Sequence, residues 1–267
     1  MDLSGRHVVV TGAAGGIGKA LAVRFHAAGA HVVVADINGA GANRTAVELN
    51  ERRADSALGV LADVGSEDGN VALIADATAR FGPVDLFFAN AGVGMGTDLD
   101  TPEDVWETAF NVNTHAHRWA AKHLLPGWLE RGEGYFCSTA SAAGLLSQIG
   151  SAPYSMTKHA AVSFAEWLSI TYGDRGVTVS CLCPQGVNTN MINADPATGG
   201  LSTSVVRASG AVLEPAEVAE VAFAAITDER FLILPHPEVL GFLQRKAGDY
   251  DRWLGGMRRL QARTAAG

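Results

Sequence analysis

A tyrosine and a lysine stand four residues apart in the segment Tyr154-Ser155-Met156-Thr157-Lys158. Residues with this spacing share one face of a helix, so the phenol of Tyr154 would lie beside the ammonium group of Lys158. The pKa of a free tyrosine is about 10, too high for an efficient base at neutral pH. Because a neighbouring cation favours phenolate, we expect Lys158 to lower the pKa of Tyr154 and Tyr154 to transfer a proton. Alone, such a pair is more often a surface feature.

A glycine-rich segment, Thr11-Gly12-Ala13-Ala14-Gly15-Gly16-Ile17-Gly18, lies between the first predicted strand and the first predicted helix. A dinucleotide-binding turn there needs Gly12 for a positive φ, Gly16 for close approach of a pyrophosphate and Gly18 for helix packing. The helix N-terminus would then face the anion. A plain tight turn is the alternative. A P-loop is excluded, because the spacing from Gly12 is one residue too long and Ala20 replaces the required Ser or Thr.

Asp36 ends the second predicted strand, where a carboxylate can accept hydrogen bonds from an adenosine ribose. Its charge would repel a 2′-phosphate. Neither Ile37 nor Gly15, which stands beside Gly16, offers a cation that could neutralise that phosphate. The sequence therefore predicts NAD rather than NADP, with a solvated strand-end residue as the alternative for Asp36.

Short apolar runs alternate with amphipathic stretches of helix length, a pattern typical of βαβ units. The predicted strands are His7–Thr11, His31–Ala35, Ala57–Ala62, Val84–Ala89, Tyr135–Ser138, Val177–Cys183 and Phe231–Leu234. The predicted helices are Lys19–Ala28, Asp68–Phe81, Glu103–Leu125 and Pro153–Tyr172. Right-handed crossovers imply an α/β fold: a doubly wound (Rossmann) parallel sheet of about seven strands, with helices on both faces and the ligand beyond the carboxyl ends of the strands.

Length and composition limit the classes of protein. The chain has 267 residues, 48% hydrophobic content and a formal net charge of −8. These values favour a single domain over 1–267 and disfavour nucleic-acid partners. Because no apolar run reaches the roughly 18 residues of a membrane span and no signal peptide is recognisable, we expect a cytoplasmic protein without a membrane partner.

Histidines and cysteines show no ligand spacing, so we expect no catalytic metal. His115 and His117 lie two apart in a predicted helix and face different directions, as ordinary surface or interface residues would. We expect Cys137, Cys181 and Cys183 to be reduced and buried, with Cys181 and Cys183 on opposite faces of a strand.

Taken together, the glycine segment, Asn90-Ala91-Gly92, Ser141 and Tyr154-x-x-x-Lys158 resemble the short-chain dehydrogenase/reductase family over about residues 5 to 190. The family serine lies thirteen residues before the tyrosine, which identifies Ser141 rather than Ser138. The resemblance implies an NAD(H)-dependent alcohol dehydrogenase or ketone reductase with Tyr154 as acid and base. The positive charge of an oxidised nicotinamide would further favour the phenolate.

The resemblance also implies residue roles. Ser141 would hydrogen-bond the substrate oxygen, Lys158 would bind the nicotinamide ribose, and Asn113 would hold a water in a proton relay to Lys158. Asn111 is the rival of Asn113, but the family motif ends on the second asparagine. The implied cofactor-binding residues are Gly12, Gly15, Gly16, Ile17, Gly18, Asp36, Ile37, Asp63, Val64, Asn90, Ala91, Gly92, Tyr154, Lys158, Pro184, Gly186, Val187 and Thr189.

Among these, the resemblance places Asp63 and Val64 at the adenine and gives Asn90 the task of bracing the central sheet. Gln185 separates Pro184 from Gly186, whereas many family members have Pro-Gly directly, so the local loop geometry departs from the pattern.

The segment 190–213 follows this loop and is rich in small residues, so we expect it to cover the substrate. The expected substrate-binding residues are Ser141, Leu146, Tyr154, Gln185 and Met191. Gly94, Met95, Leu145 and Ile149 are further candidates, although several of these could equally be core residues. Their apolar character indicates an uncharged secondary alcohol or ketone.

The stretch 237–267 is a C-terminal extension whose Trp253, Leu254, Met257 and Leu260 recur at helical spacing. We expect this stripe to be buried against a neighbouring subunit. The resemblance implies a homotetramer, with the helices at 103–125 and 153–172 forming a main interface.

Two other functions remain open: a dinucleotide-binding sensor without catalysis, and an epimerase or dehydratase that retains NAD. The intact set of Ser141, Tyr154, Lys158 and Asn113 disfavours the sensor. The length of the chain disfavours the epimerase or dehydratase, since such members usually carry a larger substrate domain.

Overall fold

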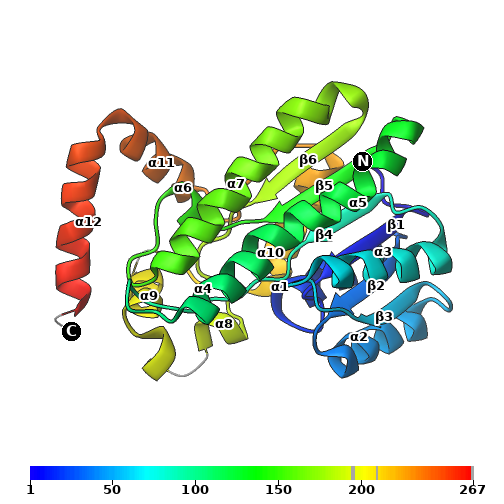
Figure 1. Ribbon diagram of the computed structural model, residues 1–267, viewed down its shortest axis with the longest axis horizontal. Helices are drawn as coiled ribbons and strands as arrows, with labels where there is room; N and C mark the ends of the chain where they lie inside the picture. Colours follow the sequence, from blue (N-terminus) through cyan, green and yellow to red (C-terminus); the bar gives the residue numbers. More distant parts are fainter. Residues whose placement is uncertain (194–195, 209, 266–267) are drawn as a thin grey trace.

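The computed structural model describes residues 1–193, 196–208 and 210–265, and a parallel β-sheet forms its centre. The strands are β1 (His7–Thr11), β2 (His31–Asp36), β3 (Ala57–Leu61), β4 (Leu86–Ala89), β5 (Gly134–Thr139), β6 (Val177–Leu182) and β7 (Leu232–Ile233). They lie in the order β3-β2-β1-β4-β5-β6-β7, and each neighbouring pair is parallel (Figure 1). The order reverses between β1 and β4, so the predicted doubly wound fold is confirmed.

Helices cover both faces of the sheet because alternate strand residues point to opposite sides. In β1, Val8 and Val10 belong to one apolar core and Val9 to the other. The first core is closed by α1 (Gly16–Ala27), α2 (Gly39–Arg52) and α10 (Pro215–Thr227). The second is closed by α3 (Glu67–Phe81), α5 (Ala116–Arg131) and α7 (Ala152–Tyr172). The two cores hold the strands in place, and the strand ends remain free for polar groups.

Several helical features differ from the prediction, and α10 is one of the helices that were not predicted. The helix α2 was not predicted; it begins after Asn38, whose side chain accepts a hydrogen bond from the Gly41 amide at 3.0 Å. The helix predicted at 103–125 is divided into α4 (Glu103–Phe110) and α5 by a π-helical turn at Asn111–His115. π-Helical turns are rare in proteins, and those that do occur are often found at functional sites. This one contains both candidate asparagines, Asn111 and Asn113.

The expected cover is mainly helical. It contains α8 (Asn190–Asn193) and α9 (Pro196–Ala208), whereas residues 194, 195 and 209 lie outside the described part. The remaining short elements are α6 (Ala142–Leu145) and a 3₁₀ turn at Gly173–Arg175.

The C-terminal extension forms α11 (Glu238–Gly248) and α12 (Tyr250–Ala265). The helix α12 stands at the outer end of the molecule, far from the sheet, and contacts α9 (Figure 1). None of its described residues is buried, and Leu254 is 48% exposed. The predicted burial of its apolar stripe is therefore not achieved within one chain.

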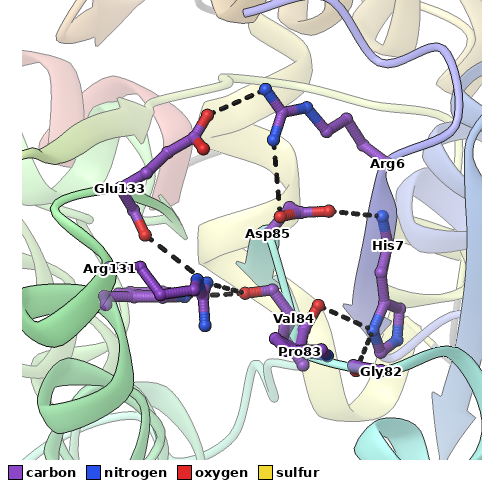
Figure 2. Close-up of polar contacts among 9 residues, drawn as sticks. Arg6, His7, Gly82, Pro83, Val84, Asp85, Arg131 and Glu133 are labelled. Carbon is purple, nitrogen blue, oxygen red and sulfur yellow. Dashed lines mark hydrogen bonds and ion pairs between the residues drawn. The ribbon is translucent and has the colours of Figure 1, made fainter.

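A polar network joins the amino ends of β1, β4 and β5 (Figure 2). Asp85 accepts a hydrogen bond from the His7 amide at 2.9 Å and pairs with Arg6 at 3.5 Å. The other guanidinium nitrogen of Arg6 lies 2.8 Å from Glu133, which precedes β5. Because the His7 ring also binds the Gly82 carbonyl at 2.8 Å, this edge of the sheet is tied together by its own side chains.

Within the described residues, no helix is long and apolar enough to cross a bilayer. The same residues contain no group of three His, Cys, Asp or Glu side chains arranged to hold a metal ion.

Candidate active site

A cleft of about 800 Å³ runs along the carboxyl ends of the strands and spans the switch point between β1 and β4. Its wall is formed by several separate segments: the glycine segment, the ends of β2 and β3, the loop after β4, Ser141 and the first turns of α7. Its described charged residues are Asp36, Asp63 and Lys158. Doubly wound folds bind ligands at the switch point, and the predicted motifs lie together at that same position.

The glycine segment forms one wall because bulkier residues would not fit. Gly12 has a φ of +65°, and a Cβ there would lie 2.8 Å from the Ala91 Cα. A Cβ at Gly18 would clash with the Gly12 carbonyl oxygen. Gly15 faces open space and caps α1 without a side-chain hydrogen bond, so the first amides of that helix are available to an anion. This cradle fits a pyrophosphate.

Asp36 is held at the end of β2 by two backbone amides. Its carboxylate accepts hydrogen bonds from Ala14 at 2.9 Å and Asn38 at 2.8 Å. These bonds connect the glycine segment with the strand end and leave further lone pairs on both oxygens for a ribose. Lys158 is the one cation among the described lining residues, and it bonds to the end of β5, three strands across the sheet.

The proton-transfer candidates meet at the other end of the cleft. Ser141 follows β5 and caps α6, whereas Tyr154 lies in the first turn of α7 and Lys158 in the next. The side chains of Ser141 and Tyr154 are hydrogen-bonded. The Lys158 Nζ lies 5.7 Å from the centre of the Tyr154 ring and donates to the Thr139 carbonyl at 2.9 Å. A phenol, a hydroxyl and an ammonium group thus converge on one point.

The expected net lowering of the pKa of Tyr154 is wrong for the chain's own residues. Burial raises the pKa of Tyr154, and the hydrogen bond with Ser141 only opposes that rise. Burial also lowers the pKa of Lys158 to about 8, since its ammonium group has lost water and gained one backbone carbonyl. The protein alone therefore holds the phenol protonated at neutral pH, and phenolate requires additional positive charge nearby.

Asn113 is fully buried in the π-helical turn and does not line the cleft, whereas its rival Asn111 does. The Asn113 side chain accepts from the Val93 amide at 2.8 Å and donates to the Val93 carbonyl at 2.9 Å. It also donates to Thr157 Oγ1 at 3.2 Å. These bonds fix the turn between the loop after β4 and α7, and the relay role remains a prediction.

Asn90 connects three strands beneath the cleft. Its Nδ2 donates to the Thr11 carbonyl at 2.9 Å, and its Oδ1 accepts from Thr139 Oγ1 at 3.1 Å. Asn90 itself follows β4, so its amide holds the carboxyl ends of β1 and β5 at fixed positions on either side. Asp63 and Val64, after β3, line the cleft, and so do Ala91 and Gly92, after β4.

In the loop after β6, Pro184, Gln185, Val187 and Thr189 line the cleft, but Gly186 does not. A residue that the sequence did not reveal fixes this loop. The buried His236 ring accepts from the Gln185 amide through Nδ1 at 3.1 Å and donates to the Gly186 carbonyl through Nε2 at 3.1 Å. Nothing in the sequence near His236 indicates such a contact, because the pairing joins segments fifty residues apart.

At the substrate end, Ser141, Tyr154, Gln185 and Met191 line the cleft as expected, but Leu146 does not. Leu145, Ile149 and Met95 are also absent from its described wall. The chain turns at Ser147, and Gln148 and Ser151 form that part of the wall instead. The substrate end is therefore more polar than the sequence indicated.

Two expectations about other residues need correction. His117 is buried, not a surface or interface residue: its Nδ1 lies 2.8 Å from Ser138 Oγ, and burial lowers its pKa to about 3. Cys181 and Cys183 do not face opposite ways, because residues two apart on a strand share a face, and their Sγ atoms are 3.7 Å apart. The expectation of free, buried thiols is confirmed for Cys137, Cys181 and Cys183.

Comparison with known proteins agrees with this geometry. Residues 6–198 match the family model described as short chain dehydrogenase. The chain is 36% identical to 1-deoxy-11-beta-hydroxypentalenate dehydrogenase of Streptomyces exfoliatus over 244 residues, which cover 89% of this chain and 86% of that protein. It is 33% identical to meso-2,3-butanediol dehydrogenase of Serratia marcescens, covering 87% and 92% of the two chains.

A solved structure is also similar over nearly the whole chain. The short-chain dehydrogenase/reductase from Burkholderia phymatum in complex with NAD aligns with a TM-score of 0.84 and 31% identity, covering 94% of this chain and 96% of that one. With the family model, the relatives and the fold in agreement, the chain belongs to the short-chain dehydrogenase/reductase family of oxidoreductases.

Proposed function

We propose that this enzyme transfers a hydride between NAD(H) and a secondary alcohol or ketone, with Tyr154 as the acid and base. The observation that carries the proposal is the convergence of Ser141, Tyr154 and Lys158 at one end of a cleft whose other end holds a glycine cradle and Asp36. When bound, the nicotinamide supplies the hydride donor or acceptor. The chain supplies orientation, proton transfer and exclusion of water.

In the direction of ketone reduction, Ser141 and Tyr154 hydrogen-bond the carbonyl oxygen, and the Tyr154 hydroxyl gives its proton to that oxygen as the carbon is reduced. The phenol is suited to this step because its raised pKa holds it protonated. In alcohol oxidation the same oxygen of Tyr154 must first be phenolate, which then accepts the alcohol proton. Lys158 stabilises the negative charge that Tyr154 carries during either step.

A screen of alcohols and ketones, followed by nicotinamide absorbance, tests the reaction class. We expect turnover of uncharged secondary alcohols or ketones, and we expect Tyr154→Phe to remove most of it while leaving the Kd for NAD within twofold. Unchanged turnover in Tyr154→Phe would refute the role of the phenol. Dinucleotide binding without turnover of any substrate would instead support the sensor.

The preference for NAD over NADP is supported by the negative charge of Asp36 and by Ile37, which is 70% exposed and carries no charge. A 2′-phosphate placed there would meet a carboxylate and no cation among the described lining residues. We expect kcat/KM with NADH to exceed that with NADPH by at least tenfold. Equal or greater efficiency with NADPH would contradict this assignment.

A cytoplasmic homotetramer is the proposed state of the enzyme. The exposed Trp167 and Ile170 on α7 and the uncovered apolar stripe of α12 support an assembly that covers both surfaces. Light scattering of the purified chain measures the mass directly, and a monomeric mass would contradict the proposed assembly.

A further inference from the structure

The segment that follows the catalytic serine has a conformation that its own sequence does not favour. We call residues 145–150 the serine-side loop. Ser147 has a φ of +149°, a region that residues with a Cβ rarely adopt. Strained backbone of this kind persists only where the surroundings hold it in place, and it is found frequently at ligand-binding sites.

A lysine from the C-terminal extension supplies one of these supports. The Lys246 Nζ donates hydrogen bonds to the carbonyls of Leu145 at 2.8 Å and Leu146 at 3.0 Å. Leu145 ends α6 and Leu146 caps it, so their carbonyls belong to the group that a helix leaves without partners at its C-terminus. A positive charge at that end of a helix is favourable.

Lys246 is placed for this contact at an electrostatic cost. Burial lowers its pKa, and among the described residues its ammonium group forms no ion pair; besides the two carbonyls, its Nζ lies 5.7 Å from the centre of the Tyr250 ring. Its helix, α11, is anchored by the fully buried Val239. Lys246 also lies beyond residues 6–198, the part of the chain that matches the family model.

The opposite side of the serine-side loop contacts the catalytic helix and the cover. The Gln148 amide donates to Ser155 Oγ at 2.7 Å, and Gln148 Nε2 donates to the Ser202 carbonyl in α9 at 3.2 Å. Gln148 lines the cleft, and so does Ser202. A displacement of the loop would therefore move Gln148, which lines the cleft, and would break the hydrogen bond between Gln148 and α9.

We propose that Lys246 is a positioning residue for the substrate end of the cleft, acting by holding the serine-side loop between α11, α7 and α9. Its ammonium group touches backbone carbonyls and not the lining of the cleft, so it takes no part in the chemistry. The inference deepens the proposed function, because the substrate end is where the alcohol or ketone would bind.

Three variants test the proposal: Lys246→Met removes the charged donor, Lys246→Arg keeps it, and Arg245→Met removes one charge from the neighbouring, exposed position of the same helix. Hydrogen exchange of the serine-side loop is measured first, since it requires no turnover. We expect at least tenfold faster exchange in Lys246→Met, with the glycine segment unchanged, near-normal exchange in Lys246→Arg and normal exchange in Arg245→Met. If Lys246→Met does not fold, Lys246→Ala, which also removes the donor, takes its place under the same criteria.

Steady-state kinetics with a substrate from the screen provide the second measurement. We expect Lys246→Met to raise the KM for the alcohol or ketone about tenfold, with the KM for the dinucleotide within twofold. Unchanged loop exchange, or equal increases in loop and glycine-segment exchange, overturns the proposal, and so do equal rises in both KM values. If even the unaltered enzyme turns over no alcohol or ketone, the proposed function fails, while the exchange experiment still decides the role of Lys246.

Discussion

At the amino ends of β1, β4 and β5, polar side chains bind one another, whereas at the carboxyl ends of the same strands they line a cleft. At the amino ends, Asp85 and Arg6 form an ion pair with each other (Figure 2). At the carboxyl ends, within the described part of the chain, the buried Lys158 side chain has one backbone carbonyl as its hydrogen-bond partner, and the Tyr154 hydroxyl has that of Ser141. The first arrangement stabilises the fold, while the second keeps polar groups available for a ligand at the expense of stability.

The largest expected effect comes from replacing Lys158 with methionine. Turnover should fall by roughly 10³-fold, because the phenolate loses its cation. Stability at pH 7 should nevertheless rise by about 1 kcal/mol, since a buried ammonium group with a pKa of about 8 is removed and only one hydrogen bond is lost. Urea unfolding and steady-state rates measure both quantities. A loss of stability together with activity would show that this edge also holds the fold together.

Asp85→Ala tests the amino ends of the strands, where we expect stability to change and turnover to stay the same. Removing the carboxylate leaves the His7 amide without its acceptor and leaves Arg6 with Glu133 as its remaining partner in this network, so the free energy of unfolding should fall by about 2 to 3 kcal/mol. Turnover per folded molecule should remain within twofold. Asp63→Ala is the matched control at the carboxyl edge, where we expect weaker dinucleotide binding and a smaller loss of stability. Reversed results would remove the contrast between the edges.

The buried His117 should make the free energy of unfolding fall at acidic pH. Its pKa is lowered to about 3 in the folded chain, whereas an unfolded histidine titrates near 6.5. Below about pH 6.5 the unfolded chain therefore binds a proton that the folded chain does not, and stability falls with pH until the folded pKa is reached. Between pH 7.5 and pH 5 this group should account for about 2 kcal/mol. Urea midpoints of the wild type and His117→Gln at both pH values test this, and equal pH dependence would contradict it.

The smallest effect is expected from Glu133→Gln at the amino edge. Glu133 is about half exposed, and its pair with Arg6 is screened by water and salt. We expect a loss of about 0.5 kcal/mol or less, vanishing in 1 M salt. A larger loss of stability would show that the exposed pair of Arg6 and Glu133, and not Asp85 alone, stabilises this end of the sheet.

The sheet and most of the motif positions could be predicted because their signals are local. The run His7–Thr11 and the turn that follows it are specified by consecutive residues, and the structure places that strand within the same bounds. The helix α2 was missed because Gly39 and Gly41 weaken the helical pattern, and its capping by Asn38 is recognisable only in the structure.

The parts of the site that escaped prediction depend on contacts between distant segments. His236 acts on Gln185, and Lys246 acts on Leu145 about a hundred residues earlier, so no local pattern announces either contact. Leu146 was chosen for its apolar side chain, but the backbone turn at Ser147 brings Gln148 to the wall instead. The pKa of Tyr154 was misjudged because spacing reveals the nearby cation and says nothing about the depth of burial.

The complete burial of Cys137, Cys181 and Cys183 has a practical consequence for spectroscopy. Maleimide dyes and spin labels react with accessible thiolates, and burial shields these sulfurs. Burial also raises the pKa of Cys137, while the contact with the Cys183 thiol, together with burial, raises the pKa of Cys181. A single cysteine introduced on the exposed side of α12 would therefore carry a fluorophore alone, without removal of the native residues. Its emission would report on the surroundings of that helix as ligands or neighbouring chains bind.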